Sequence, residues 1–290
     1  MALLNEPAPL AQTDHHHILT LFRRARHRHM HIDWRTLDQW LENPMLWARV
    51  LREGDAVTSM IGATVHKHPL HPDADPVAWL RFMAPGNGPR DPGFRVLWNA
   101  LRADLKNRGV TEVACLIMHP WTQRAITDWG FEHINAIVTL RRIGGEIPDD
   151  HLPDDTQLRT GTLADLDAVT RVDAAAFEPL WAYGRATIRL AIEEAASFTV
   201  LETASELVGY QITTDHYSSA HLARLAVMPG LQGRGYGRVL VSDMLRSFKE
   251  RRITLVTVNT QEDNLRSRRL YSHLSFQRAG YDVPVYSLRI

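Results

Sequence analysis

Three glycines lie close together in the segment Gln232–Gly237, between a predicted strand and a predicted helix. The apolar run 222–227 precedes the segment, and the apolar residues that follow it recur at the spacing of one helix face. A helix N-terminus presents unpaired N–H groups and a positive dipole end, and glycines allow an anion to approach that backbone closely. The segment could therefore bind phosphate. Its spacing is neither that of the Rossmann glycine motif nor that of a Walker loop, and an ordinary turn is the alternative interpretation.

Composition indicates a globular protein that is large enough for two domains. The chain has 290 residues, of which 44% are hydrophobic and 23% charged, as in ordinary folded proteins. Lys+Arg and Asp+Glu total 33 each, so no overall charge attracts nucleic acid or an anionic membrane. The basic run Arg23–His31 is the one local feature that suggests nucleic acid, and we rank that function last.

The N-terminal residues lack the basic start and apolar core of a signal peptide, and no apolar run of about 18 residues is present. We therefore expect a soluble, cytoplasmic protein without a membrane partner. The single cysteine, Cys115, lies in an apolar run and should be a buried structural thiol. Contiguous or alternate histidines do not share a helix face as residues at i and i+4 do, so we expect a solvated surface and no metal site at the N-terminal histidines. These histidines are His15, His16, His17, His27, His29 and His31.

The elements around the glycine segment occur in one order twice along the chain. Alternating apolar residues predict strands, and a 3.6-residue period predicts helices. After two N-terminal helices, the first half contains strands at 47–51, 56–65 and 77–83, a helix at 94–105, a strand at 110–117, a helix at 121–129 and a closing strand at 134–140. The second half contains strands at 197–201, 207–213 and 222–227, a helix after the glycine segment, a strand at 253–259, a helix at 264–273 and a closing strand at 283–288.

Matching residues support a duplication. Pro85 stands 144 positions before Pro229, and Phe131 stands 145 positions before Phe276. A nearly constant offset of half the chain length indicates that one domain was repeated. The predicted division is a first domain, 1–148, a polar linker, 149–155, and a second domain, 156–290.

The first half has lost the features that would bind an anion. Prolines stand at the positions of Gly233 and Tyr236, and Asp91 stands at the position of Gly235. Each proline removes an N–H donor, and the aspartate places a negative charge where a phosphate would lie. We therefore predict one anion site per chain, in the second half. The prolines are Pro89 and Pro92.

Two consecutive segments carry the most specific pattern in the sequence. The first is Val227-Met228-Pro229 with the glycine segment, and the second is Asn264-Leu265-Arg266-Ser267 followed by Leu270-Tyr271 and Leu274-Ser275-Phe276. Together, over 222–276, they resemble the acetyl-CoA-binding motifs of the GCN5-related N-acetyltransferase (GNAT) family. Ser275 stands where the family usually has glycine, a change that affects a turn. The resemblance implies an α/β fold with two tandem GNAT-like domains, each a mixed, mostly antiparallel sheet flanked by helices.

By the same resemblance, the first half is a degenerate copy of the second. His119 and Ile126 stand there in place of Asn264 and Tyr271. The resemblance therefore implies a tandem protein with one working site.

The resemblance also implies acetyl-CoA as the co-substrate. Its pyrophosphate would lie on the amides of the glycine segment, and its pantetheine arm along the strand edge Leu225–Val227. Asn264 matches the residue that hydrogen-bonds the pantetheine arm, and Tyr271 matches the tyrosine that protonates the departing thiolate. A tyrosine packed between helix and sheet is the alternative for Tyr271. The implied cofactor-binding residues are Leu225, Ala226, Val227, Gln232, Gly233, Arg234, Gly235, Tyr236, Gly237, Asn264, Ser267 and Tyr271.

Direct transfer to an amine also needs a base that removes a proton from the ammonium group. His221 and Glu262 are the first candidates for a catalytic base, because they lie beside the strands that would hold the cofactor. Asp215 and His216, in the preceding loop, are further candidates and would contact the acceptor substrate. Each of the four is also compatible with plain surface.

The segment 173–181 resembles the Phe-Pro-Trp region of RimI-like protein N-terminal acetyltransferases. In that group the segment lines the peptide entrance, which implies that Phe177 and Trp181 contact the acceptor. Their i, i+4 spacing equally fits a hydrophobic core.

The leading hypothesis is an acetyl-CoA-dependent N-acetyltransferase that acts on a primary amine, either a protein N-terminus or a small molecule. A non-catalytic acyl-CoA-binding sensor or scaffold is the alternative, because the first half resembles an inactive copy. The sequence leaves the acceptor open and is compatible with a homodimer.

Overall fold

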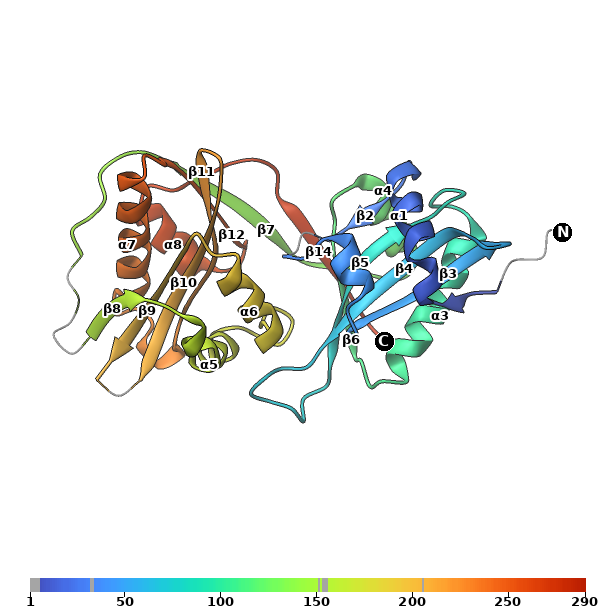
Figure 1. Ribbon diagram of the computed structural model, residues 1–290, viewed down its shortest axis with the longest axis horizontal. Helices are drawn as coiled ribbons and strands as arrows, with labels where there is room; N and C mark the ends of the chain where they lie inside the picture. Colours follow the sequence, from blue (N-terminus) through green and yellow to red (C-terminus); the bar gives the residue numbers. More distant parts are fainter. Residues whose placement is uncertain (1–5, 32–33, 151, 153–155, 205) are drawn as a thin grey trace. The chain divides into compact units, whose positions relative to one another are not determined.

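The chain forms two compact units in the computed structural model, which describes residues 6–31, 34–150, 152, 156–204 and 206–290. The first unit contains the residues up to Lys67, Asp73–Ile134 and Val283–Ile290, and the second contains His68–Pro72 and Asn135–Asp282. Each unit has a mixed, mostly antiparallel sheet with helices against it (Figure 1). This architecture confirms the predicted fold class.

The elements of the first unit are β1 (Ala8–Pro9), η1 (Gln12–Asp14), α1 (His15–Arg24), β2 (His29–Met30), α2 (Leu37–Leu41), β3 (Leu46–Glu53), β4 (Ala56–His66), β5 (Val77–Ala84), α3 (Pro92–Lys106), β6 (Glu112–Leu116), α4 (Pro120–Asp128) and β14 (Val283–Arg289). Its strand order is β1-β3-β4-β5-β6-β14, and β2 pairs with β5. β5 and β6 are parallel because α3 crosses between them, whereas β3–β4, β4–β5 and β6–β14 are antiparallel.

The helix α3 forms where the sequence predicts it. Asp91 caps its N-terminus by accepting a hydrogen bond from the Gly93 N–H at 2.9 Å, and Pro92 occupies its first position. The predicted stripe on this helix is buried in a core that it shares with α4. Trp98, for example, stacks on Trp129 with ring centroids 5.3 Å apart.

The elements of the second unit are β7 (Glu132–Ile143, from Asn135 onwards), β8 (Thr156–Thr160), η2 (Leu163–Asp165), α5 (Leu166–Ala176), α6 (Arg185–Glu193), β9 (Ser197–Thr203), β10 (Leu207–His216), β11 (Ser219–Val227), η3 (Pro229–Leu231), α7 (Tyr236–Glu250), β12 (Leu255–Gln261), α8 (Leu265–His273) and β13 (Gln277–Arg278). The strand order is β7-β12-β11-β10-β9-β8, with β13 paired to β7. β11 and β12 are parallel and are joined through α7. Figure 1 shows α7 and α8 on one side of this sheet and α5 and α6 on the other.

Each closing strand pairs in the other unit from the one that the sequence halves predict. β14, at the end of the chain, pairs with β6 in the first unit. β7, at the end of the first half, pairs with β12 in the second unit, where Thr139 lies opposite Asn259. The units therefore do not coincide with residues 1–148 and 156–290. The alternation of a strand specifies its buried face but does not specify which sheet edge it joins.

A β-bulge changes the direction of side chains along β11. Ile212 pairs with Arg224 and Thr213 pairs with Leu222, so Ala223 is the extra residue. Leu222 packs into the core beneath α7 and α8. Arg224 instead points to Asp173 on α5. Strict alternation would place Leu222 and Arg224 on the same face, and the bulge separates them.

The turn after α8 has the conformation that the family pattern implies. Ser275 has φ +63°, in the left-handed region that favours glycine. Its counterpart in the first half, Gly130, has φ +94°. The substitution of serine for glycine therefore keeps the turn, although it places a side chain in a conformation that favours glycine.

The expectation of a solvated N-terminal histidine surface is wrong for His29. Its side chain is fully buried on β2, and burial lowers its pKa to about 4. Cys115 is buried, as predicted, with its Sγ 3.8 Å from His29 Nε2. The period of a two-residue strand is too short to reveal such burial in the sequence.

Parts of three predicted segments lie outside the described residues. These are 1–5 of the N-terminal segment, 151 and 153–155 of the linker, and Ser205 between the predicted strands 197–201 and 207–213. Among the described residues, no helix has the length and apolar character needed to cross a bilayer.

Candidate functional site

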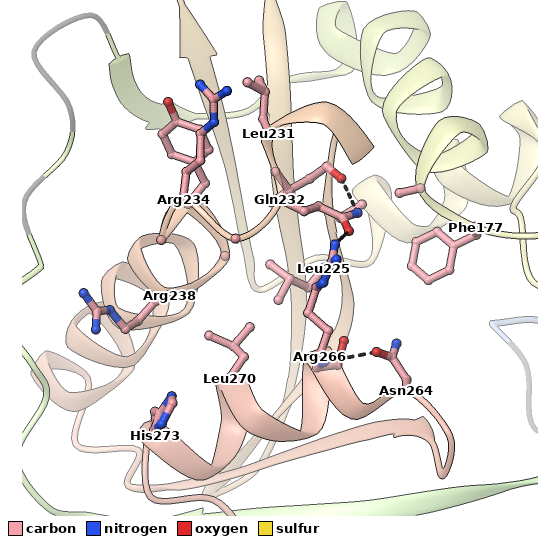
Figure 2. A pocket seen from close by; sticks show the side chains of 18 residues that line it. Phe177, Leu225, Leu231, Gln232, Arg234, Arg238, Asn264, Arg266, Leu270 and His273 are labelled. Carbon is pink, nitrogen blue, oxygen red and sulfur yellow. Dashed lines mark hydrogen bonds between the residues drawn. The ribbon is translucent and has the colours of Figure 1, made fainter.

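A pocket of about 740 Å³ lies in the second unit where β11 meets the helices α7 and α8 (Figure 2). It contains most of the predicted cofactor-binding residues and several that the sequence did not indicate. The lining residues are Ala176, Phe177, Leu225, Ala226, Val227, the segment 231–238, Asn264, Arg266, Ser267, Leu270 and His273.

The glycine segment forms a turn that leads directly into α7. Gly233 and Gly235 have φ +85° and +91°, and an added Cβ at either position would meet nothing within 4 Å. Gly235 is the N-cap residue, and no side chain caps this described helix end. The first-turn residues Tyr236, Gly237 and Arg238 line the pocket, and no side chain caps their end of α7. The helix dipole adds positive potential there.

Basic side chains surround the same turn. Arg234, Arg238, Arg266 and His273 line the pocket (Figure 2). Such a concentration of positive charge beside a helix N-terminus favours a ligand with several phosphate groups. Of the four, only Arg234 is predicted from the sequence. A basic residue in the first turn after a glycine loop is the signal that could have identified Arg238.

Two of these arginines already have partners. Arg238 Nε lies 2.6 Å from a carboxylate oxygen of Asp150, a nearly buried side chain. Arg266 donates to the side-chain oxygen of Gln232, whose Nε2 donates to the Val227 carbonyl at 2.9 Å. The contacts of Gln232 hold the turn against the end of β11. The carboxylate of Asp150 also offsets part of the positive charge in the pocket.

The helix α8 carries the second predicted motif. Asn264 caps this helix, because its Oδ1 accepts from the Ser267 N–H at 3.0 Å. Both residues line the pocket. Tyr271 follows on the same helix face, since i, i+3 and i+7 lie on one side of a helix. The three residues thus form one row that starts at the pocket and leads into the core.

Tyr271 is buried at the inner end of that row. It is 4% exposed, its ring centroid lies 5.5 Å from that of Phe276, and it is not among the described residues that line the pocket. Burial raises the pKa of its phenol above 10, so the hydroxyl is protonated at neutral pH. Its role as a proton donor stays a prediction.

The structure separates the candidate bases. His221 lies next to the position where β11 and β12 diverge, and its Nδ1 is 2.8 Å from Thr257 Oγ1. Glu262 is half-exposed and bonds to Arg278 at 3.2 Å. None of these residues lines the pocket.

The predicted acceptor-binding residues also occupy different places. Phe177 lines the pocket, whereas Trp181 does not. Asp215 forms an ion pair with Arg251. His216 is exposed, beside the hairpin that begins β11. Asp215 and His216 therefore lie at the end of β11 away from the pocket.

Comparison with known proteins finds a family match in the second half of the chain. Residues 166–276 match the family described as Acetyltransferase (GNAT) family. A mycothiol acetyltransferase of Acidothermus cellulolyticus is 31% identical over 189 residues, which cover 57% of this chain but only 58% of that protein. A mycothiol acetyltransferase of Rhodococcus opacus is 26% identical over 270 residues, which cover 81% of this chain and 88% of that protein.

Solved structures share the fold of the whole chain. A tandem GNAT protein from the clavulanic acid biosynthesis pathway has a TM-score of 0.63 and 17% identity, with 98% of each chain covered. A probable N-acyltransferase from Enterococcus faecalis V583 has a TM-score of 0.73 and 10% identity, with 98% of this chain and 72% of that chain covered. At these identities the likeness concerns the fold alone, and the RimI-like character of the acceptor segment stays a prediction. The chain therefore contains a segment, 166–276, that matches the GNAT acetyltransferase family, and its fold is that of a tandem GNAT protein.

Proposed function

We propose that the second unit is an acetyl-CoA-dependent N-acetyltransferase that transfers an acetyl group directly to a primary amine. One observation carries the proposal, namely a single pocket that joins an open strand edge to an uncapped helix N-terminus. The β11–β12 pairing ends at Leu222 and Val258, so within the described residues Leu225–Val227 have no strand partner on that side. An extended pantetheine arm could pair with this edge.

The charge of the pocket supports the same ligand. The backbone N–H groups of Gln232–Gly237 suit a pyrophosphate, and the surrounding basic side chains suit the remaining phosphate of CoA. The thioester would then lie towards the divergence of β11 and β12, close to His221. The relatives named as acetyltransferases support acetyl as the transferred group.

In the proposed reaction the amine nitrogen forms a bond to the thioester carbonyl carbon, and the carbon–sulfur bond breaks. The ammonium must first lose a proton, which His221 would accept directly or through water. The departing thiolate would take a proton from the Tyr271 hydroxyl, which lies further along the helix face that starts at Asn264. The second proton that the acylated nitrogen loses would return to the Tyr271 phenolate through water.

The His221 role predicts a pH dependence. Burial lowers the pKa of His221 below 6.5, so the ring is neutral at pH 7 and can accept a proton. As the pH falls through this lowered pKa, the ring becomes protonated and can no longer act as a base. The acid limb of kcat/KM should therefore have a midpoint below 6.5. His221→Gln should lower kcat/KM by about 100-fold and remove that limb. His216→Gln, at an exposed site away from the pocket, is the control. An unchanged acid limb in His221→Gln would exclude His221 as the base.

In the first unit, residues of the chain itself occupy both the strand edge and the helix N-terminus that a cofactor would need. Its β5–β6 pairing ends at Trp79 and Ala114, and beyond that point β2 pairs with β5. The His31 N–H completes the pairing by donating to the Arg81 carbonyl at 2.9 Å. The β5 residues 81–83 stand 144 positions before Leu225–Val227, so β2 occupies the edge that corresponds to the open edge of β11.

A side chain of the first unit also occupies the position that corresponds to the anion site of the second unit. Asp91 stands at the position of Gly235, and its carboxylate accepts the Gly93 N–H at the start of α3. A carboxylate therefore lies where the second unit would bind a phosphate. Together with β2, this supports the proposal that the first unit takes no cofactor.

A calorimetric titration of the full chain with acetyl-CoA tests both parts of the proposal. We expect one bound acetyl-CoA per chain, and an increase in thermal stability because the ligand binds the folded state. Mass spectrometry should then show acetyl transfer to glucosamine or to a hexapeptide that begins with alanine. These two probes represent the small-molecule and N-terminal acceptor classes.

The outcomes separate the alternatives. Absence of binding and of thermal stabilisation would exclude the acetyl-CoA site. A stoichiometry of two acetyl-CoA molecules per chain would contradict the proposal that the first unit takes no cofactor. Binding without transfer across a broad panel of amines would favour a non-catalytic acyl-CoA sensor, a function that the burial of Tyr271 away from the pocket also supports.

A further inference from the structure

A buried ion pair fixes the segment 177–184, which connects α5 to α6 beside the pocket. Asp173, in the last turn of α5, is fully buried. Its two carboxylate oxygens accept hydrogen bonds from Arg224 on β11, from Nε at 2.6 Å and from Nη2 at 2.9 Å. The paired hydrogen bonds set the orientation of the guanidinium group as well as its position.

The segment itself contacts this ion pair at several atoms. The Trp181 carbonyl accepts from Arg224 Nη2 at 2.8 Å, and the Tyr183 N–H donates to Asp173 Oδ1 at 2.7 Å. The rings of Phe177 and Tyr183 lie over the guanidinium, with centroids 3.5 and 3.8 Å from its central carbon. One arginine therefore holds a carboxylate, a backbone carbonyl and two aromatic rings, an arrangement that suits a planar guanidinium and does not suit an ammonium group.

These contacts connect the two sides of the pocket. Phe177 forms part of the wall near Asn264 (Figure 2). Leu225, the residue after Arg224, lies on the strand edge proposed for the cofactor. The β-bulge at Ala223 makes this possible, because it directs Arg224 towards α5 while Leu225 lines the pocket. The position of the Phe177 wall thus depends on the strand that would hold the cofactor.

We infer that Arg224 is a positioning residue, which holds the segment 177–184 against β11 and thereby sets the acceptor side of the pocket. The inference rests on the proposed function for the identity of the ligands. It assigns no catalytic contact to Arg224, since its Nε and Nη2 groups donate to Asp173 and to the Trp181 carbonyl. It predicts that loss of the arginine geometry weakens use of the amine and leaves the binding of acetyl-CoA intact.

The substitution Arg224→Lys keeps the charge and removes the forked geometry. Backbone amide hydrogen exchange over 177–184 should become at least about tenfold faster, because the loss of one hydrogen bond changes an equilibrium by roughly that factor. KM should rise about tenfold for the faster of the two probe amines, glucosamine or the alanine-starting hexapeptide. The Kd for acetyl-CoA should stay within about twofold, because the glycine segment is untouched.

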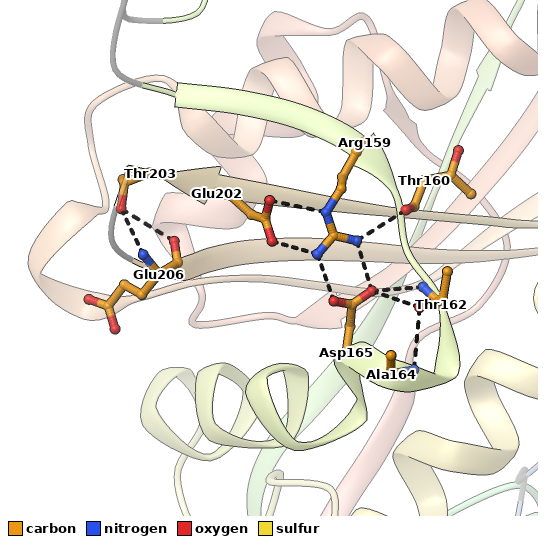
Figure 3. A network of polar contacts seen from close by, with 8 residues as sticks. All are labelled: Arg159, Thr160, Thr162, Ala164, Asp165, Glu202, Thr203 and Glu206. Atoms are coloured by element: carbon orange, nitrogen blue, oxygen red, sulfur yellow. Dashed lines mark hydrogen bonds and ion pairs between the residues drawn. The ribbon is translucent and has the colours of Figure 1, made fainter.

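Arg159→Lys is a matched control in the same unit. Like Arg224, Arg159 forms forked hydrogen bonds to a carboxylate, with Asp165 at 2.7 and 2.9 Å, and it also bonds Glu202 through Nε at 3.0 Å (Figure 3). None of these three residues lines the pocket. The control therefore removes a similar forked contact without changing the segment 177–184.

Two results would overturn the positioning role. One is wild-type exchange and KM in Arg224→Lys, and the other is an equal effect of Arg159→Lys on the same segment. If Arg224→Lys does not fold, Phe177→Leu removes one ring from the guanidinium and keeps the ion pair, and an unchanged amine KM in that variant would also overturn the role. If the wild-type protein binds no acetyl-CoA, the proposed function fails, while the exchange comparison still decides whether Arg224 holds the segment.

Discussion

Replacing Gly235 with valine should weaken the binding of acetyl-CoA by a factor on the order of 100. Gly235 has φ +91° at the N-cap of α7, a conformation that a β-branched residue adopts only with strain. Relief of that strain would turn the neighbouring N–H groups away from the pocket. The expected loss corresponds to one charge-assisted hydrogen bond to phosphate, which contributes about 1.5–3 kcal/mol. Calorimetric titration of the variant measures the loss directly.

Two other glycines separate the cofactor effect from strain. Gly88, in the first unit, has φ +99° and open space around an added Cβ, so Gly88→Val introduces the same kind of strain in the unit proposed to bind nothing. Gly230 lies beside the glycine segment without a positive φ, so Gly230→Ala should be nearly neutral. If Gly88→Val weakened acetyl-CoA binding as much as Gly235→Val, the loss would reflect general instability. Full affinity in a folded Gly235→Val protein would contradict the assignment of the phosphate site.

Local signals made the central part of this site predictable. The glycine segment, the following helix and the Asn264 cap each depend on residues within a few positions of one another, and the structure places all three at the pocket. The buried stripe of α3 was predictable for the same reason, because the 3.6-residue period lies within one helix. The match to the family over 166–276 agrees with where these local signals are concentrated.

Features that depend on distant pairing were not predictable from these patterns. The exchange of β7 and β14 is a choice between two sheet edges, and both strands present similar alternating residues to either edge. The bulge at Ala223 appears only as a register shift against β10. Without it, Arg224 would be expected beneath α7, and its contact with Asp173 would not be foreseen. The burial of His29 likewise depends on its pairing with β5, which the polar character of the segment obscured.

The row of residues along α8 predicts a separate effect for Tyr271→Phe. Removal of the hydroxyl should lower kcat by about 10²–10⁴-fold, the usual contribution of a general acid, and should change the Kd for acetyl-CoA by less than about twofold. The phenol pKa is raised by burial, so the hydroxyl is protonated throughout the neutral range and available to the departing thiolate. Loss of this acid by ionisation would occur only above pH 10. Steady-state kinetics and calorimetry on the same preparation give both numbers.

Phe276→Leu tests whether packing, and not the hydroxyl, explains such a loss. Phe276 contacts the ring of Tyr271 in the core beneath α8, so this variant loosens the packing and leaves the hydroxyl in place. It should lower the melting temperature while kcat stays near that of the wild-type protein. If Tyr271→Phe instead abolished acetyl-CoA binding, or if Phe276→Leu lowered kcat equally, Tyr271 would be a structural residue between α8 and the sheet. A different proton donor would then have to protonate the thiolate, because a neutral hydroxyl on this helix face would no longer account for the chemistry.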